Sequence, residues 1–288
     1  MNNLQYELRQ LCQRNRDGSH STQANRAHML SLAARELYGL GFKGLRAANL
    51  APKHVEALVE HWAQKGLGTA TVKNRLATLR WWAEKLNRAN VVPRDNVTLG
   101  VARRSYSDNI DKGRDLTPEQ LARITSDHAR ASLQLAQAFG LRMEESLKIR
   151  PRQADGGNVL ELQGSWTKGG RPREVSITHE AQRDALDFAK RVAGEGSLIP
   201  TKHSYRSYVS AFRAQLQRAG IDGMHALRHR FAQELYRHMT GWDCPARAGP
   251  KVRELSGEQR SIDRRVRLEI SLELGHNRID ITSRYLGR

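Results

Sequence analysis

Cysteine is scarce in this sequence, which has only Cys12 and Cys244 among its 288 residues. The two lie far apart in the chain and lack the spacing of a metal site, so a disulfide framework is not expected and a reducing compartment fits. Long apolar runs are also missing, since no stretch approaches the roughly 20 residues that cross a bilayer. The first residues contain no apolar signal segment. These absences argue against the secreted and membrane classes and predict a cytoplasmic protein.

Acidic residues are few compared with basic ones. Lys and Arg number 48 against 30 Asp and Glu, which gives a net charge of +18. A chain this basic usually has a polyanionic partner, most often nucleic acid, although ribosome association or solubility would give the same balance. Hydrophobic residues make up 39% of the chain, which is enough for a core. The length suits one large domain or two ordinary ones.

Residues 1–100 predict a helical domain. Ser21 or Thr22 can cap a helix that runs to Tyr38, and Pro52 stands where a second helix can begin. A further helix follows, with apolar residues at helical spacing and basic residues over the rest of its surface. A solvated face would carry the same charges, but the basic composition favours a phosphate-facing surface. The candidate DNA contacts on this helix are Lys73, Arg75 and Arg80.

Residues 101–114 show no apolar period and predict a linker before a second domain over 115–288. Thr117, Pro118 and Gln120 form a helix-start signal. Alternating residues predict a β-hairpin. The predicted fold is therefore mainly α with a small antiparallel β-sheet. The strands are expected at 158–162 and 173–177, and the later helices at 179–192, 203–219, 225–238 and 266–275.

Arg142 and Glu145 are three residues apart in a segment that predicts a helix, so they share a face and can pair. A guanidinium fixed in this way suits two oxygens of one phosphate, although an ordinary surface ion pair has the same spacing. Lys168 stands in the glycine-containing turn of the predicted hairpin. It is either a solvent-exposed turn residue or an ammonium that reaches a leaving oxygen. Arg171 and Lys202 compete for that role.

His225 and Arg228 are three residues apart at the start of a predicted helix. Two cations at this spacing repel unless an anion such as phosphate lies between them. A helix that contacts DNA in general, through His229 and Arg230 as well, is the alternative.

His276 follows a glycine that can end a helix, and Tyr285 follows nine residues later. Taken singly, these two are more often a helix cap and a packing residue. A phenol, with an ordinary pKa of about 10, needs a base and nearby positive charge to act as a nucleophile. Arg142, Arg228 and His225 supply both, together with His276.

The ordered motifs resemble the active site of the tyrosine recombinases, and the chain is similar to phage-type integrases over nearly its whole length. The resemblance implies a helical, SAM-like core-binding domain over 1–100 and an α+β catalytic domain over 115–288. The motifs are Gly140-x-Arg142-x-x-Glu145, the hairpin Lys168, His225-x-Leu-Arg228-His229, Leu274-Gly275-His276 and Tyr285.

The resemblance implies site-specific cleavage and rejoining of DNA with no metal and no other cofactor. Tyr285 would attack the scissile phosphate and form a 3′-phosphotyrosyl link. Lys168 would protonate the departing 5′ oxygen, and His225 would help to take the tyrosine proton. The implied partner is double-stranded DNA, in the cytoplasm at the nucleoid, with a homotetramer assembled on two duplexes. The phosphate would be bound by Arg142, Arg228 and His276, with Glu145 in support.

Two features depart from the family pattern. The chain between Arg228 and Leu274 is longer than usual, which predicts an inserted loop over 240–266 that contacts DNA or a second protomer. Only three residues follow Tyr285, so a monomer is expected in solution, with assembly on DNA. Two other functions fit this fold: a non-catalytic DNA-binding protein and a type IB topoisomerase. The complete catalytic set disfavours the first, and family-like motif spacing disfavours the second.

Overall fold

The computed structural model describes residues 2–103, 109–276 and 278–288. The chain divides into two compact units, Met1–Ser105 and Tyr106–Arg288. Part of the predicted linker, residues 104–108, lies outside the described residues. The predicted fold class is confirmed, because the described chain is mostly helical with one two-stranded antiparallel sheet. Within these residues, no helix combines the length and the apolar character that crossing a bilayer requires.

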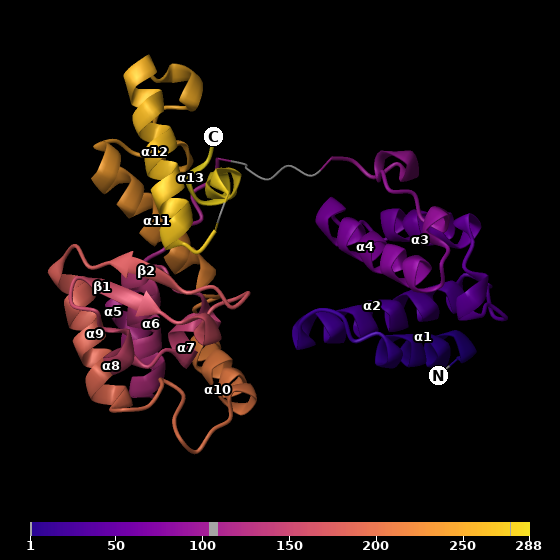
Figure 1. Cartoon of the computed structure of the whole chain (residues 1–288), viewed down its shortest axis with the longest axis horizontal. Coiled ribbons are helices and arrows are strands. Elements are labelled where there is room, and N and C mark those ends of the chain that lie inside the picture. The colour runs from indigo at the N-terminus through magenta and orange to yellow at the C-terminus, as the bar shows by residue number, and fades with distance from the viewer. Residues whose placement is uncertain (1, 104–108, 277) are drawn as a thin grey trace. The chain divides into compact units, whose positions relative to one another are not determined.

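The first unit is a helical bundle in which α2 packs against the other three helices (Figure 1). Ser19, rather than Ser21 or Thr22, caps α2, since its Oγ accepts from the backbone N of Thr22 at 3.2 Å. Trp62 and Trp82 fill the core, with exposed fractions of 1% or less. The helices are α1 (Asn3–Arg14), α2 (His20–Gly39), α3 (Pro52–Gln64) and α4 (Thr69–Lys85).

The first helix of the second unit begins at the predicted Thr117 cap, and the hairpin follows later in the unit. Strand β1 (Val159–Leu162) pairs antiparallel with β2 (Arg173–Ser176), so that Leu160 lies opposite Val175. Strand β1 contacts α8 and β2 contacts α12. The helices before and after the hairpin are α5 (Pro118–Ala122), α6 (Asp127–Phe139), α7 (Met143–Lys148), α8 (Pro151–Ala154), α9 (Glu180–Ala193) and α10 (Tyr205–Arg218).

The last three helices of the unit pack together: α11 (His225–Thr240), α12 (Gly257–Glu273) and α13 (Ser283–Leu286) (Figure 1). Helix α12 begins at Gly257, so the prediction of a loop over 240–266 is wrong for its last ten residues. The overlooked signal is a capping box, in which Ser256 and Gln259 each accept from the backbone N of the other. The glycines and prolines just before Ser256 favoured a loop, so the start of the helix was not predicted there.

The early part of α12 is joined to α11 by a hydrogen bond to a buried carboxylate, which also pairs with an arginine of α12. Asp263 accepts from the hydroxyl of Tyr236 at 2.6 Å and from Arg267 Nε at 2.8 Å. Arg267 Nη1 donates to the carbonyl oxygen of Gly287 at 3.0 Å. The early part of α12 therefore holds the chain directly after α13.

Candidate active site

The end of α12 collects three arginine side chains from different parts of the second unit. Arg142 Nη2 donates to the carbonyl oxygen of Leu274 at 3.1 Å, and Arg228 Nη2 donates to the same oxygen. Arg173 Nε donates to the carbonyl oxygen of Glu273 at 2.8 Å. The free carbonyl groups at a helix C-terminus carry partial negative charge and stabilise nearby cations. The fold thereby concentrates positive charge at one place.

Arg142 is the residue that precedes α7, rather than a residue within the helix as the sequence predicted. Its backbone N donates to Glu145 Oε2 at 2.8 Å, and its Nη1 donates to Glu145 Oε1 at 2.7 Å. The predicted pair of Arg142 and Glu145 thus forms at the start of the helix. The carboxylate fixes the plane of the guanidinium, which suits contact with two oxygens of a phosphate.

Arg228 is almost fully buried, with 1% of its surface exposed, and it contacts the candidate nucleophile. Its Nε donates to the Tyr285 hydroxyl at 3.3 Å, and its Nη1 donates to the carbonyl oxygen of Gly140. Burial lowers the pKa of Arg228 to about 10, so the guanidinium stays charged at neutral pH. A charged, buried guanidinium therefore donates to the tyrosine oxygen.

His276 lies between Arg142 and Tyr285. Its Nε2 is 3.4 Å from Arg142 Nη2 and 3.4 Å from the Tyr285 hydroxyl oxygen. Burial, together with the charges of Arg228 and Arg142, lowers the pKa of His276 to about 4, so the ring is neutral at pH 7. A guanidinium only donates, so this contact favours the tautomer whose Nε2 carries a lone pair. Arg142 and the tyrosine hydroxyl therefore share the one acceptor lone pair of the ring.

Two further histidines surround the Tyr285 ring. The His225 ring centre is 5.8 Å from it, and the His229 ring centre is 4.8 Å from it. Packing of the surrounding protein and the charges of Arg228 and Arg142 hold the pKa of His225 below its usual range. Tyr285 itself is 4% exposed, so the phenol is a packed side chain with its oxygen directed at cationic and imidazole groups.

These groups open onto one cavity of about 800 Å³. Lys168 and Arg171 reach it from the loop between β1 and β2, and Arg228 contacts the cavity through the Tyr285 hydroxyl. Six cationic side chains and one carboxylate, Asp280, line the cavity, which suits a bound anion. Of the predicted catalytic residues, the structure places five in its lining: Arg142, Lys168, His225, His276 and Tyr285.

Two family models match this chain. The model of the N-terminal part of phage integrases matches residues 1–92, and the integrase model matches residues 108–234. The chain belongs to the phage integrase family of tyrosine recombinases. The second match includes Arg142, Lys168, His225 and Arg228, whereas His276 and Tyr285 lie beyond it. No protein in the curated collection matches this recombinase in sequence.

Solved structures with the same fold cover nearly the whole recombinase. A lambda integrase dimer bound to a core site has a TM-score of 0.60 at 17% identity, covering 99% of this chain and 96% of the other. The Tn1549 transposon integrase with circular intermediate DNA has a TM-score of 0.58 at 14% identity, covering 100% and 96%. The XerH site-specific recombinase in a post-cleavage complex has a TM-score of 0.61 at 15% identity, covering 98% and 80%.

The predicted DNA contacts of the recombinase fall into two groups. Arg171 lines the cavity, and Lys73 lies partly exposed on α4. Arg75, Arg80 and Arg230 instead have protein partners. Arg75 Nη1 is 3.1 Å from Glu36 Oε1, Arg80 Nη2 donates to the carbonyl oxygen of Pro93 at 2.6 Å, and Arg230 Nε is 3.1 Å from Asp115 Oδ2.

His229 requires a correction. The sequence placed it among the DNA contacts, but it is 6% exposed and packs against the Tyr285 ring. Burial lowers the pKa of His229 to about 4. A neutral imidazole with 6% exposure offers little surface and no charge to a DNA backbone, so His229 is not among the DNA contacts proposed below. His229 lies one helical turn after His225 on α11, so both rings face Tyr285.

Arg173 was not predicted as a site residue. It is the first residue of β2, its side chain is 6% exposed, and it donates to both oxygens of Glu145 at 2.7 and 2.8 Å. The sequence did contain a signal, because Arg173 has the same strand parity as the buried Val175 and therefore faces inward. An arginine on the apolar face of a strand needs a buried partner.

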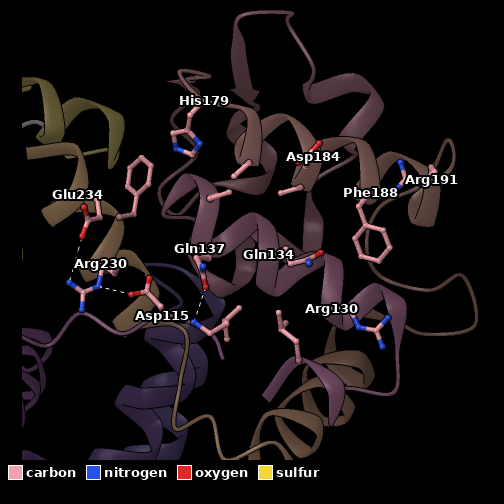
Figure 2. Close-up of a pocket in the computed structure, with 16 residues that line it drawn as sticks. Asp115, Arg130, Gln134, Gln137, His179, Asp184, Phe188, Arg191, Arg230 and Glu234 are labelled. Atoms are coloured by element: carbon pink, nitrogen blue, oxygen red, sulfur yellow. Dashed lines mark hydrogen bonds and ion pairs between the residues drawn. The ribbon is translucent and has the colours of Figure 1, made fainter. Parts of the chain in front are cut away.

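A second hollow, of about 660 Å³, lies between α6, α9 and α11 (Figure 2). Its rim carries paired charges, since Arg230 lies between Asp115 and Glu234. Gln137 on the same rim accepts from the backbone N of Leu116 at 2.9 Å. None of the six predicted catalytic residues lines it. With charges of both signs on its rim, it lacks the excess of cations that suits the Tyr285 cavity to phosphate.

Proposed function

We propose that this site-specific recombinase binds double-stranded DNA and cleaves and rejoins it through a 3′-phosphotyrosyl link to Tyr285. One observation carries the proposal: the Tyr285 hydroxyl lies within 3.4 Å of both Arg228 and His276 at the wall of a strongly cationic cavity. The similar lambda, Tn1549 and XerH structures hold DNA, which supports the same class of substrate here.

The first chemical step joins the Tyr285 oxygen to the scissile phosphorus and breaks the bond from phosphorus to the 5′ oxygen. The resemblance implied that His225 takes the phenol proton and that His276 binds the phosphate. Because His276 Nε2 lies 3.4 Å from the Tyr285 hydroxyl, we assign the proton to His276, with His225 beside it. Lys168 donates a proton to the departing oxygen. Arg142 and Arg228 bind the non-bridging oxygens and stabilise the charge that builds on them. In the second step a 5′ hydroxyl attacks the phosphotyrosyl link, so the number of phosphodiester bonds is unchanged.

Tyr285 lies among the arginines of its own chain, which supports cleavage by each subunit at the phosphate that it binds itself. We propose a homotetramer on two duplexes as the recombining assembly. One of the similar structures is a lambda integrase tetramer bound to a Holliday junction, which supports that number. We assign DNA contacts to Lys73 of the helical core-binding domain, over residues 1–100, and to Arg171 of the catalytic domain, over residues 115–288, joined by a linker at 101–114.

Strand exchange tests the function. Two labelled duplexes that carry the same recombination site should yield recombinant products in EDTA without ATP, because the phosphotyrosyl link conserves the bond energy. A type IB topoisomerase would relax supercoiled DNA and form adducts without joining strands of two duplexes. A non-catalytic DNA-binding protein would shift both duplexes on a gel and form no adduct. Either result would refute the proposal.

Lys168→Ala is expected to slow cleavage by about 100-fold or more, the range of a lost general acid. A substrate with sulfur in the 5′-bridging position should restore the rate, because a thiolate leaves without a proton. Single-turnover cleavage of the two substrates measures both effects. Arg171→Ala, which removes a cation from the same loop, is the matched control and should show no rescue by sulfur. Failure of sulfur to rescue Lys168→Ala would remove Lys168 from this role.

DNA binding is expected to weaken steeply with salt. The slope of log affinity against log salt should become shallower by about 0.9 for each phosphate contact removed. Lys73→Ala in the first unit and Arg171→Ala in the second should each show this change in the intact chain, and fluorescence anisotropy across salt concentrations measures it. Arg152→Ala, whose guanidinium pairs with Glu195, is the control. An unchanged slope for Lys73→Ala would contradict a contact from the first unit.

A further inference from the structure

Arg173 has all three of its guanidinium nitrogens bound to protein oxygens. Nη1 and Nη2 donate to the two oxygens of Glu145 at 2.8 and 2.7 Å, and Nε donates to the carbonyl oxygen of Glu273 at 2.8 Å. The side chain is 6% exposed, and it does not line the cavity that Tyr285 faces. Arg173 therefore acts on the site through other residues rather than by touching a substrate.

Glu145 is a fully buried carboxylate shared by two arginines. Its Oε1 accepts from both Arg142 Nη1 and Arg173 Nη1. Burial alone would raise the pKa of Glu145, but the hydrogen bonds and charge of Arg173, together with Arg142, lower it to about 2. Arg142 is partly exposed, with 22% of its side chain accessible. Arg173 is thus the enclosed partner that keeps the carboxylate charged for Arg142.

Arg173 also packs against the Leu274-Gly275-His276 turn. Gly275 has a φ of +65°, and a Cβ atom there would lie 3.0 Å from Arg173 Cδ. A side chain at this position would be strained by the backbone and would meet the arginine. The glycine of this motif therefore leaves room for Arg173 directly before His276.

The same residue anchors the loop that carries Lys168. Arg173 begins β2 immediately after this loop, and Thr167 Oγ1 donates to the carbonyl oxygen of Arg171 at 2.6 Å to close it. The side chain of Arg173 joins the base of the loop to α7 through Glu145 and to α12 through Glu273. Three parts of the site, contributed by Arg142, His276 and Lys168, thus meet at one side chain.

We propose that Arg173 is a positioning residue that orients Arg142 through Glu145 and fixes the loop of Lys168 against the Leu274–His276 turn. The proposal rests on the recombinase function given above and concerns the geometry of that same site. Misplacement of reacting groups by about 1 Å costs roughly 100-fold in rate. Loss of Arg173 should therefore reduce the rate of cleavage far more than the affinity for DNA.

The variant Arg173→Met keeps the length of the side chain and removes its charge and hydrogen bonds. Single-turnover cleavage should slow by about 100-fold, with the dissociation constant for DNA within a few-fold of the wild-type value. Arg173→Lys restores one charge without the two-oxygen contact, so its rate should be intermediate. Arg183→Met is the matched control, because Arg183 also binds both oxygens of a carboxylate, Asp155, at 2.9 and 2.8 Å. Its cleavage rate should match that of the wild type.

The pH profile distinguishes positioning from a loss of folding. The charged groups that face Glu145 are Arg142 before α7 and Arg173 on β2. The titratable ring of His276 after α12 also lies near it, and Arg228 on α11 lies beyond them. Without Arg173 the pKa of Glu145 rises, so Arg173→Met should lose further activity as pH falls through that raised value. The double variant Arg173→Met with Glu145→Gln should lack this additional acid-side loss, because residue 145 no longer titrates.

If the wild type forms no adduct, the proposed function fails, and the positioning role that rests on it fails with it. If the wild type cleaves and Arg173→Met cleaves equally fast with the same pH profile, the positioning role is refuted. The role is also refuted if the variant loses activity only at temperatures where it unfolds. In that case it shows no additional loss at acid pH at a temperature where it is folded. A slow, folded variant with the added pH dependence supports it.

Discussion

Tyr285→Phe is expected to bind DNA and to form no covalent adduct. The substitution removes only the hydroxyl oxygen, which accepts from Arg228 Nε at 3.3 Å and lies 3.4 Å from His276 Nε2. The ring packing that keeps Tyr285 4% exposed is retained, so the fold should persist. Nicked suicide substrates that trap the link, resolved on a denaturing gel in EDTA, measure the adduct.

Tyr208→Phe is the matched control for this experiment, because Tyr208 is also a buried tyrosine of the second unit, 3% exposed. That variant should form as much adduct as the wild type. An adduct that persists in Tyr285→Phe would show that another residue is the nucleophile. Failure of Tyr285→Phe to bind DNA would show instead that the hydroxyl is needed for the structure of the site.

Arg142→Ala is expected to lower the rate of cleavage by roughly 100- to 1000-fold, the usual cost of removing one preorganised donor to a developing negative charge. The fold should survive, because Glu145 retains both hydrogen bonds from Arg173 and is not left as an unpaired buried charge. The pKa of Glu145 would still be held below its usual range. Single-turnover cleavage and thermal melting, measured on the same preparations, separate the two effects.

Arg218→Ala serves as the control for lost positive charge, since Arg218 is exposed at the end of α10. It should cleave at the wild-type rate with a similar melting temperature. A wild-type rate in Arg142→Ala would remove Arg142 from the phosphate site. Unfolding of Arg142→Ala at pH 7 would show that Arg173 alone does not stabilise the Glu145 carboxylate.

Protonation of Glu145 gives the structure an acid limit with a definite sign. Its pKa is about 2 in the folded chain, below the ordinary value of about 4.3 for an unfolded glutamate. A lowered pKa stabilises the fold fully above the unfolded value, and the contribution is lost as pH falls from there through the folded value. The Arg142–Glu145–Arg173 cluster is therefore charged at neutral pH, and its contribution to stability is lost only as pH falls from about 4.3 toward 2.

Local signals in the sequence were enough for most of the secondary structure. The Thr117 cap and the proline at the start of α3 lie where the structure has them, because caps and first turns depend on neighbouring residues. The hairpin strands were predicted from alternation alone. Where a local signal was overlooked, as in the Ser256 capping box, the start of a helix was misplaced.

The function class also followed from the sequence, because the order and spacing of the motifs from Arg142 to Tyr285 are typical of the family. Both can be read without the structure. Only the tertiary structure decided how these residues meet. Arg173 reaches Glu145 from 28 residues away and Glu273 from 100 residues away, and Arg142 reaches Leu274 from 132 residues away. The inward position of His229 likewise depends on where Tyr285 packs. Such contacts arise from packing between elements, which periodicity along one element does not specify.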